Sequence, residues 1–318
     1  MHRTNLTAPT DSGSWVALRL ELPPTAVPGL RPGAANGNRI VLSQGADTVL
    51  LATVDDDRGG VTYSRTDHYR SPVAPLRAAE ARAVAGHGQP SWYARWAHRF
   101  ADALEASPLG PLHDGRWVLS RKLARDEAPR AAGGPAGRWR SLLLDEHPDG
   151  CVDWFTGSWQ VLPLRRMPSP DHGRVKAYRK QAREGTLPPV LLWWFSGLHC
   201  YLVLDGHARL AAAVAENREP AVLALSRALP EERTGAGRDK ALETYRLTMS
   251  VLDGPHPVTG HQESARAASR LLAAQLHDLD VAHAPTRAWP VPEVRPAPAR
   301  PLNRSGCPGG STPAGPSP

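Results

Sequence analysis

The sequence lacks the features that place a chain in a membrane or outside the cell. Its 318 residues contain no run approaching 18 consecutive apolar residues, the length that a membrane-spanning helix requires. The first ten residues lack the apolar stretch of a secretory signal peptide, so we expect a protein that is not exported. Three cysteines, Cys151, Cys200 and Cys307, are far apart and form no Cys-x-x-Cys pair. They indicate no disulfide framework and favour a cytoplasmic location.

The sequence also lacks the signatures of several large enzyme classes. It has no Gly-x-Ser-x-Gly nucleophile elbow, no Walker-type phosphate loop and no His-Glu-x-x-His zinc motif. Its 13 histidines and three cysteines do not stand at the spacings typical of zinc ligands, so we expect no metal site. These absences argue against α/β-hydrolase, P-loop and zinc-protease chemistry.

Proline is abundant, and the net charge is positive. Proline accounts for 32 residues, about twice its usual share, which predicts long irregular segments between ordered parts. Apolar residues make up 41%, enough for a folded core, and the net charge is +7. Ten Lys and Arg stand against five Asp and Glu between Ser158 and Arg227. This excess favours an anionic partner, either a nucleotide or nucleic acid, although a basic surface can also serve solubility alone.

The hydrophobic pattern predicts an α+β protein of five parts. Residues 1–14 are expected to form a flexible arm, and residues 15–150 an N-terminal α+β region of unknown type. A compact module follows at residues 151–228, and a helical extension at residues 229–283. Residues 284–318 contain ten prolines and no periodicity, which predicts a disordered tail.

Periodicity predicts the individual elements. Strands are expected at residues 15–22, 39–42, 48–54, 61–64, 116–119, 139–144, 151–155, 159–164, 190–195, 200–204 and 221–225. Helices are expected at residues 76–86, 91–106, 171–184, 207–216, 238–252 and 260–279. We expect Ser91 to cap the second helix, whose apolar stripe is Trp92, Trp96, Phe100 and Leu104. The basic helix at 171–184 either faces solvent, which we favour, or lies along nucleic acid.

The segment Tyr201–Ala213 carries the most information about function. It predicts a buried strand, a glycine turn and a helix that begins at His207. The first turn of a helix exposes unpaired N–H groups and a partial positive charge, which suit a phosphate group. Gly206 allows close approach of an anion, and Arg209 can add charge-assisted contacts. Asp205 can cap the helix, orient His207 or hold a metal that accompanies a nucleotide. The alternative is that Asp-Gly only forms the turn between strand and helix, as it commonly does, and that Arg209 pairs with a neighbouring carboxylate.

Three motifs occur in a specific order between Ser158 and Arg227. They are a Val161-Leu-Pro-Leu164 segment, a Gly185-Thr-Leu-Pro-Pro-Val190 segment and an Asp-Gly-His-x-Arg-x-x-Ala-Ala turn at Asp205, Gly206, His207, Arg209, Ala212 and Ala213. This order resembles the ParB/sulfiredoxin fold family over about 70 of the 318 residues. The resemblance implies a ParB/sulfiredoxin-like module with a phosphate site at Asp205, Gly206, His207, Ala208 and Arg209.

Differences within the turn distinguish the branches of that family. Sulfiredoxin has a nucleophilic cysteine where this chain has His207, so sulfiredoxin chemistry is not expected. ParB proteins, which are CTP-binding DNA clamps, have a Glu-Arg pair where this chain has His207 and Ala208. Small-molecule kinases of the fold have Asp-Gly-His-His-Arg, which this chain matches except at Ala208. Those kinases need an acidic base, for which Asp171 and Glu184 are the candidates nearest in sequence.

These observations lead to one leading interpretation and two alternatives. The leading interpretation is a cytoplasmic, ParB-like nucleotide-binding protein, regulatory or DNA-associated, with phosphates bound at the Gly206–Arg209 turn. The first alternative is an ATP- or ADP-dependent kinase of a small hydroxyl compound, and the second is a degenerate scaffold without catalysis. The resemblance implies CTP, or ATP or ADP with Mg²⁺, as the ligand. The predicted partners are a nucleotide and nucleic acid, with no membrane.

Overall fold

The chain folds into two β-sheets with helices around them. The computed structural model describes residues 1–8, 13–55, 59–84, 86–121, 134–154, 160–254 and 261–291. Over these residues the fold is a mixed α+β arrangement, as the sequence predicted. No helix in this part of the chain combines the length and the apolar character needed to cross a bilayer. Cys200 is free and buried, whereas Cys151 is disulfide-bonded, so the cysteines do not support the predicted reducing environment.

The larger sheet, sheet A, has seven strands and contains the turn of interest. In spatial order they are β1 (His2–Thr7), β2 (Trp15–Leu22), β7 (Gly115–Ser120), β12 (Val222–Arg227), β10 (Val190–Phe195), β11 (Cys200–Asp205) and β9 (Val161–Pro163). Strand β7 pairs antiparallel with β12, with Leu119 opposite Leu225. This pairing crosses residue 150, so the two regions on either side of it share one sheet.

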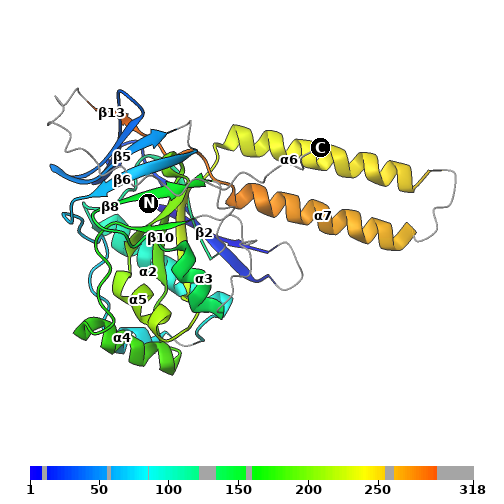
Figure 1. Ribbon diagram of the computed structural model, residues 1–318. Coiled ribbons are helices and arrows are strands. Elements are labelled where there is room, and N and C mark those ends of the chain that lie inside the picture. The colour runs from blue at the N-terminus through cyan, green and yellow to red at the C-terminus, as the bar shows by residue number, and fades with distance from the viewer. Residues whose placement is uncertain are drawn as a thin grey trace, which may run out of the picture.

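The smaller sheet, sheet B, has six strands and lies across one end of sheet A (Figure 1). In spatial order they are β13 (Trp289–Pro290), β3 (Leu30–Ala35), β4 (Arg39–Gln44), β5 (Asp47–Asp55), β6 (Gly60–Arg65) and β8 (Asp149–Asp153). Strand β8 pairs antiparallel with β6, with Val152 opposite Val61. Residues 149–153 therefore complete a sheet of the N-terminal region rather than opening the module.

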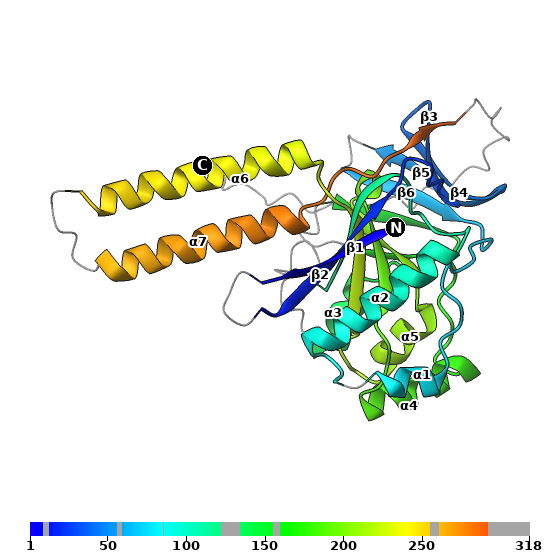
Figure 2. The same ribbon diagram turned by 180° about the vertical axis from the view of Figure 1, so that it is seen from behind.

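Helices cover both faces of sheet A, and two of them project away from it (Figures 1 and 2). They are α1 (Ala78–Ala83), α2 (Pro90–Ala106), α3 (Gly134–Leu142), α4 (Gly173–Glu184), α5 (His207–Ala215), α6 (Glu231–Leu252) and α7 (His261–Val281), with a short 3₁₀ turn at Ser196–Leu198. Helix α2 crosses one face, and α5 with α3 lies on the other. Helices α6 and α7 run side by side as the projecting pair.

Alternation along β10 divides the core between the two faces of sheet A. Leu191, Trp193 and Phe195 join the main core, which includes the aromatic stripe of α2. Leu192 and Trp194 point to the other face and pack in a second cluster with residues of α3 and α5. Successive side chains of a strand point to opposite faces, so this fully buried strand supports a helix layer on each side. The layer with α5 holds the predicted phosphate turn.

Four further sequence predictions differ from the structure. Residues 2–7 form β1 against β2 instead of a loose arm, and Arg3 pairs with Asp102 of α2 at 2.5 Å. Residues 139–142 belong to helix α3, where Trp139 and Leu142, three residues apart, are both buried. Helix α2 begins after Gln89, because Pro90 takes its first position, so Ser91 does not cap it. Residues 284–291 contain β13, and only residues 292–318 of the predicted tail lie outside the described residues.

Candidate functional site

The predicted turn forms between a buried strand and a helix. Strand β11 ends at Asp205 and α5 starts at His207. Gly206 between them has φ +99°, a left-handed conformation that favours glycine. A Cβ at this position would lie 2.8 Å from Nη2 of Arg209. The turn therefore needs glycine both for its backbone conformation and for the close approach of the Arg209 side chain.

Arg209 forms an ion pair inside the protein. Its Nη2 donates to Asp205 Oδ2 at 2.6 Å and to the carbonyl oxygen of Pro189 at 3.0 Å. The side chains of Arg209 and Asp205 are 3% and 12% exposed. Asp205 thus neutralises the charge of Arg209. The bond from Arg209 to Pro189 connects the turn to the segment before β10. This geometry opposes the predicted role of Arg209 as a direct phosphate ligand, and Asp205 does not cap α5.

His207 is buried without a hydrogen-bond partner. The residue is 0% exposed, and neither Nδ1 nor Nε2 of its ring has a partner. Burial lowers the pKa of His207 well below its ordinary value, and the charges of Arg165, Arg209 and Arg65 lower it further. The ring is therefore neutral near pH 7, with one N–H to donate and one nitrogen that can accept. A buried polar group without a partner is unfavourable, which makes this ring a candidate for contact with a bound group.

Arg65 reaches the same region from sheet B. It is 3% exposed, and its Nη1 donates to the carbonyl oxygen of Pro163 at 2.8 Å. Its Nε and Nη2 have no partner, and it forms no ion pair within the described part of the chain. Burial lowers the pKa of Arg65, and Tyr63 and the carboxylates of Asp67, Asp145 and Glu146, which lie beyond ion-pair distance, act in the opposite direction. The guanidinium also lies over the Tyr63 ring, 5.5 Å from its centroid. A buried guanidinium without a counter-ion is costly to a fold.

Arg165 supplies the solvent-facing part of the region. It follows β9 and is partly exposed, with no hydrogen bond or ion pair to any described residue. Its neighbour Arg166 is engaged instead, because Nη2 contacts His147 Nδ1 at 3.0 Å and the backbone N–H donates to Asp67. We call Arg65, Arg165, His207 and Arg209 the cationic cluster. Three arginines thus surround a neutral histidine, and Asp205 is paired to one of them.

Residues 66–73 cover the turn. The hydroxyl of Tyr69 donates to the carbonyl oxygen of Leu204 at 2.6 Å, and the Tyr69 ring lies 6.1 Å from the His207 ring. Ser71 Oγ donates to Asp205 Oδ1 at 2.8 Å. These contacts join positions more than 130 residues apart in the chain, and they close the turn from the side of sheet B.

The remaining sequence candidates lie away from the cationic cluster. Ala208 is buried against α4 in a small apolar cluster. Asp171 is exposed and lies 3.5 Å from Lys176, and Glu184 lies 3.3 Å from Arg82. Neither carboxylate is therefore placed as a base beside His207. Within the described residues, no group of three His, Cys, Asp or Glu side chains could hold a metal ion.

The basic helix α4 is largely neutralised by its own neighbours. Arg179 and Arg183 both pair with Glu216, at 2.6 and 2.7 Å. Lys176 and Lys180 lie near Asp171 and Glu184. These pairs support the interpretation of α4 as a solvated helix rather than a nucleic-acid surface.

Sequence reasoning missed Arg65, Arg165, Tyr69 and Ser71. One signal for Arg65 was available, because Val61, Tyr63 and Arg65 alternate along β6 and are all buried. An arginine in register with an apolar face predicts a buried charge. Comparison with known proteins adds no assignment: no family model, curated protein or solved structure matches the chain.

Proposed function

We propose that the protein is a ParB-like nucleotide-binding protein, regulatory or DNA-associated, that receives a phosphate group at the cationic cluster. One observation carries the proposal: His207 is fully buried, both ring nitrogens lack a partner, and the charges acting on it are three arginines. An anion placed there would satisfy the ring N–H and offset the unpaired charge of Arg65. The resemblance around the turn and the β-α-β-β-α-β order of residues 161–227 support the same ligand class.

In this proposal the groups of the cluster have different roles. Arg165 makes the first contact, since it is the partly exposed arginine without a partner. The His207 N–H and the backbone N–H groups of the first turn of α5 then donate to phosphate oxygens, aided by the helix dipole. Arg209 holds Asp205 and Pro189 and so positions the turn without touching the ligand. CTP, or ATP or ADP with Mg²⁺, remains the proposed ligand.

The ligand reaches His207 only if residues 66–73 shift. Tyr69 and Ser71 close the turn through one hydrogen bond each, to Leu204 and Asp205. Each of these two hydrogen bonds contributes about 0.5–1.5 kcal/mol net. The segment is also held by Gln44, which bonds the backbone of Arg70 twice, and by the buried side chains of Tyr69 and Val73. Ligand contacts must therefore exceed the cost of moving the Tyr69 side chain out of the core. Phosphate oxygens that replace the Tyr69 side chain would therefore open a site that the free protein keeps closed.

Binding without chemistry is the better-supported form of this function. A kinase needs a base within hydrogen-bond reach of the substrate hydroxyl. Asp171 and Glu184 are paired elsewhere, and Asp205 is engaged by Arg209 and Ser71. The charged groups that act on His207 are arginines, which stabilise phosphate charge but do not accept a proton. The structure therefore gives the kinase alternative no specific support.

A thermal-shift panel tests the proposal. CTP, ATP, ADP and GTP, each at millimolar concentration with Mg²⁺, are compared on the wild type, Arg165→Ala and Arg246→Ala. Arg246 lies exposed on α6, so its replacement removes the same charge far from the turn. A ligand at 100 times its Kd stabilises the native state by about 2.7 kcal/mol. We expect one nucleotide to raise Tm by several degrees in the wild type and Arg246→Ala, and not in Arg165→Ala. No shift with any nucleotide, or equal shifts in both variants, would refute the proposal.

A further inference from the structure

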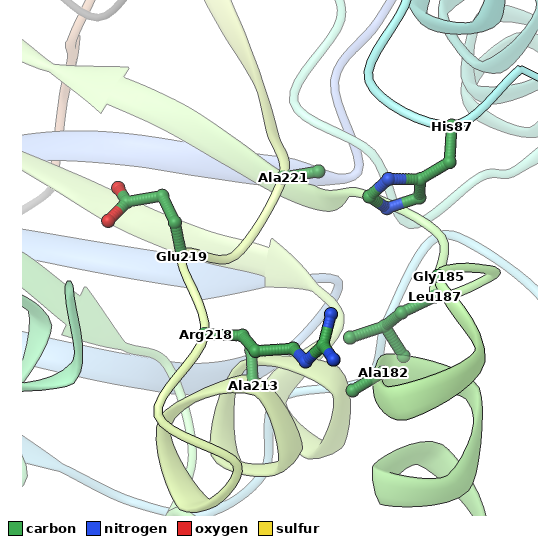
Figure 3. Close-up of a pocket in the computed structure, with 8 residues that line it drawn as sticks. All are labelled: His87, Ala182, Gly185, Leu187, Ala213, Arg218, Glu219 and Ala221. Atoms are coloured by element: carbon green, nitrogen blue, oxygen red, sulfur yellow. The ribbon is translucent and has the colours of Figure 1, made fainter.

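A separate concave site lies beside Leu187, two residues before the Pro189 carbonyl that Arg209 contacts. It is a cavity of about 240 Å³ between the ends of α4 and α5 and the loop before α2 (Figure 3). Two polar side chains, His87 and Arg218, face it, and its apolar wall comes from Ala182, Leu187, Ala213 and Ala221. Ligand pockets for drug-sized molecules usually have about 300–1,000 Å³, so this cavity fits a smaller molecule.

Arg218 gives the cavity one unpaired positive charge. Its guanidinium points between Leu187 and His87 and forms no hydrogen bond or ion pair with any described residue. Glu219, its neighbour in sequence, turns its carboxylate away (Figure 3). That carboxylate accepts a hydrogen bond from Trp139 Nε1 at 2.6 Å and so is held on the far side. The cavity therefore presents a cation without the counter-ion that stands next to it in sequence.

His87 supplies a second, neutral polar group. Its ring packs on Trp92 with the ring centroids 4.6 Å apart, which fixes its orientation. Burial lowers the pKa of His87, a hydrogen bond to the backbone of Leu187 raises it, and the charge of Arg218 lowers it. The bond to Leu187 occupies one ring nitrogen and leaves the other for a ligand. Near pH 7 the ring therefore acts as a neutral hydrogen-bonding group beside the guanidinium. One charge, one imidazole and an aliphatic wall thus converge on one small space.

We propose that this cavity binds a small aliphatic carboxylate. A guanidinium binds a carboxylate through two parallel N–H···O bonds, and a single carboxylate charge matches the single unpaired arginine. The alanine and leucine wall accommodates a chain of a few carbons, because burying apolar surface there excludes water without leaving polar groups unpaired. A nucleotide is too large and too highly charged for this site. The inference stands on residues outside the cationic cluster and does not depend on nucleotide binding.

Calorimetric titration with butyrate tests this inference, with butyramide as the neutral analogue of equal shape. The variants are Arg218→Ala, Arg218→Lys and Ala221→Leu, and the charge-matched control is Arg174→Ala, an exposed arginine of α4. We expect Kd for butyrate to rise at least tenfold in Arg218→Ala and Ala221→Leu and to stay within twofold in the control. Arg218→Lys should fall between them, because lysine keeps the charge but loses the two-pronged geometry.

The outcomes that overturn the inference are specific. They are no heat of binding with butyrate, equal affinity for butyramide, or an unchanged Kd in Arg218→Ala. Arg218 is exposed, so its replacement is not expected to unfold the protein, and circular dichroism confirms that each variant is folded. If Ala221→Leu fails to fold, the Arg218 variants decide the question alone. Nucleotide binding would survive a negative result, because none of these variants alters the cationic cluster.

Discussion

Replacement of Arg209 by alanine should be severely destabilising. The change removes hydrogen bonds at 2.6 Å to Asp205 and at 3.0 Å to Pro189, and it leaves the Asp205 carboxylate with only Ser71 in a buried site. Breaking a buried ion pair on one side costs about 3–5 kcal/mol, because the remaining charge is left uncompensated. The exposed Asp171–Lys176 pair is the control, and Lys176→Ala should cost about 0–1 kcal/mol.

Urea denaturation at pH 7 measures both free energies of unfolding. A double-mutant cycle with Asp205→Ala then isolates the pair. When Asp205 is already alanine, Arg209→Ala should cost less than it does in the wild type, since no carboxylate is stranded. A loss below about 1 kcal/mol for Arg209→Ala alone would refute the internal ion pair. It would also restore Arg209 as a free phosphate ligand.

Three further predictions concern the same region. Arg65→Met should leave the ligand-free protein about as stable as the wild type, because removing a buried charge without an ion-pair partner offsets the loss of its hydrogen bond to Pro163 and its contact with the Tyr63 ring. A clear loss in urea denaturation would contradict this. From pH 7.5 to 5.5 the protein should lose about 1.4 kcal/mol through His207, because the unfolded chain takes up a proton near pH 6.5 and the buried ring does not. His207→Phe should lack that part of the pH dependence, and an unchanged profile would exclude His207 as its source. Gly206→Ala should cost about 1–3 kcal/mol of stability, and more than Gly45→Ala. Gly45 also has a positive φ, but a Cβ added there meets nothing within 4 Å. Equal losses in thermal denaturation would argue against the contact with Arg209.

Local patterning predicted most of the elements that form the core. The alternation in residues 15–22 and the stripe of α2 are properties of the segments themselves, and both are confirmed. Strands β1, β3 and β13 were missed because each depends on pairing with a neighbouring strand, which the local sequence does not show. For example, β13 is a two-residue strand that pairs with β3 more than 250 residues away. Residues 139–142 were misread because two apolar residues, Trp139 and Leu142, followed by two more leucines are too few to distinguish the helical period from the strand period.

The sequence predicted the turn but not what surrounds it. Strand, glycine and helix follow directly from the order of Leu204, Asp205, Gly206 and His207, and the structure confirms them. The partner of Arg209 was the alternative that sequence left open, because spacing alone does not show where a guanidinium points. Arg65, Tyr69 and Ser71 come from another part of the chain, and only the packing of sheet B against sheet A brings them to the turn.

The most direct test of the phosphate site is a crystal of the protein soaked in tungstate, a heavy-atom analogue of phosphate. The account predicts an anomalous peak within hydrogen-bond distance of a ring nitrogen of His207 and of the Arg165 guanidinium, with residues 66–73 shifted. Tungstate found elsewhere, with the His207 ring still without a partner, would contradict it.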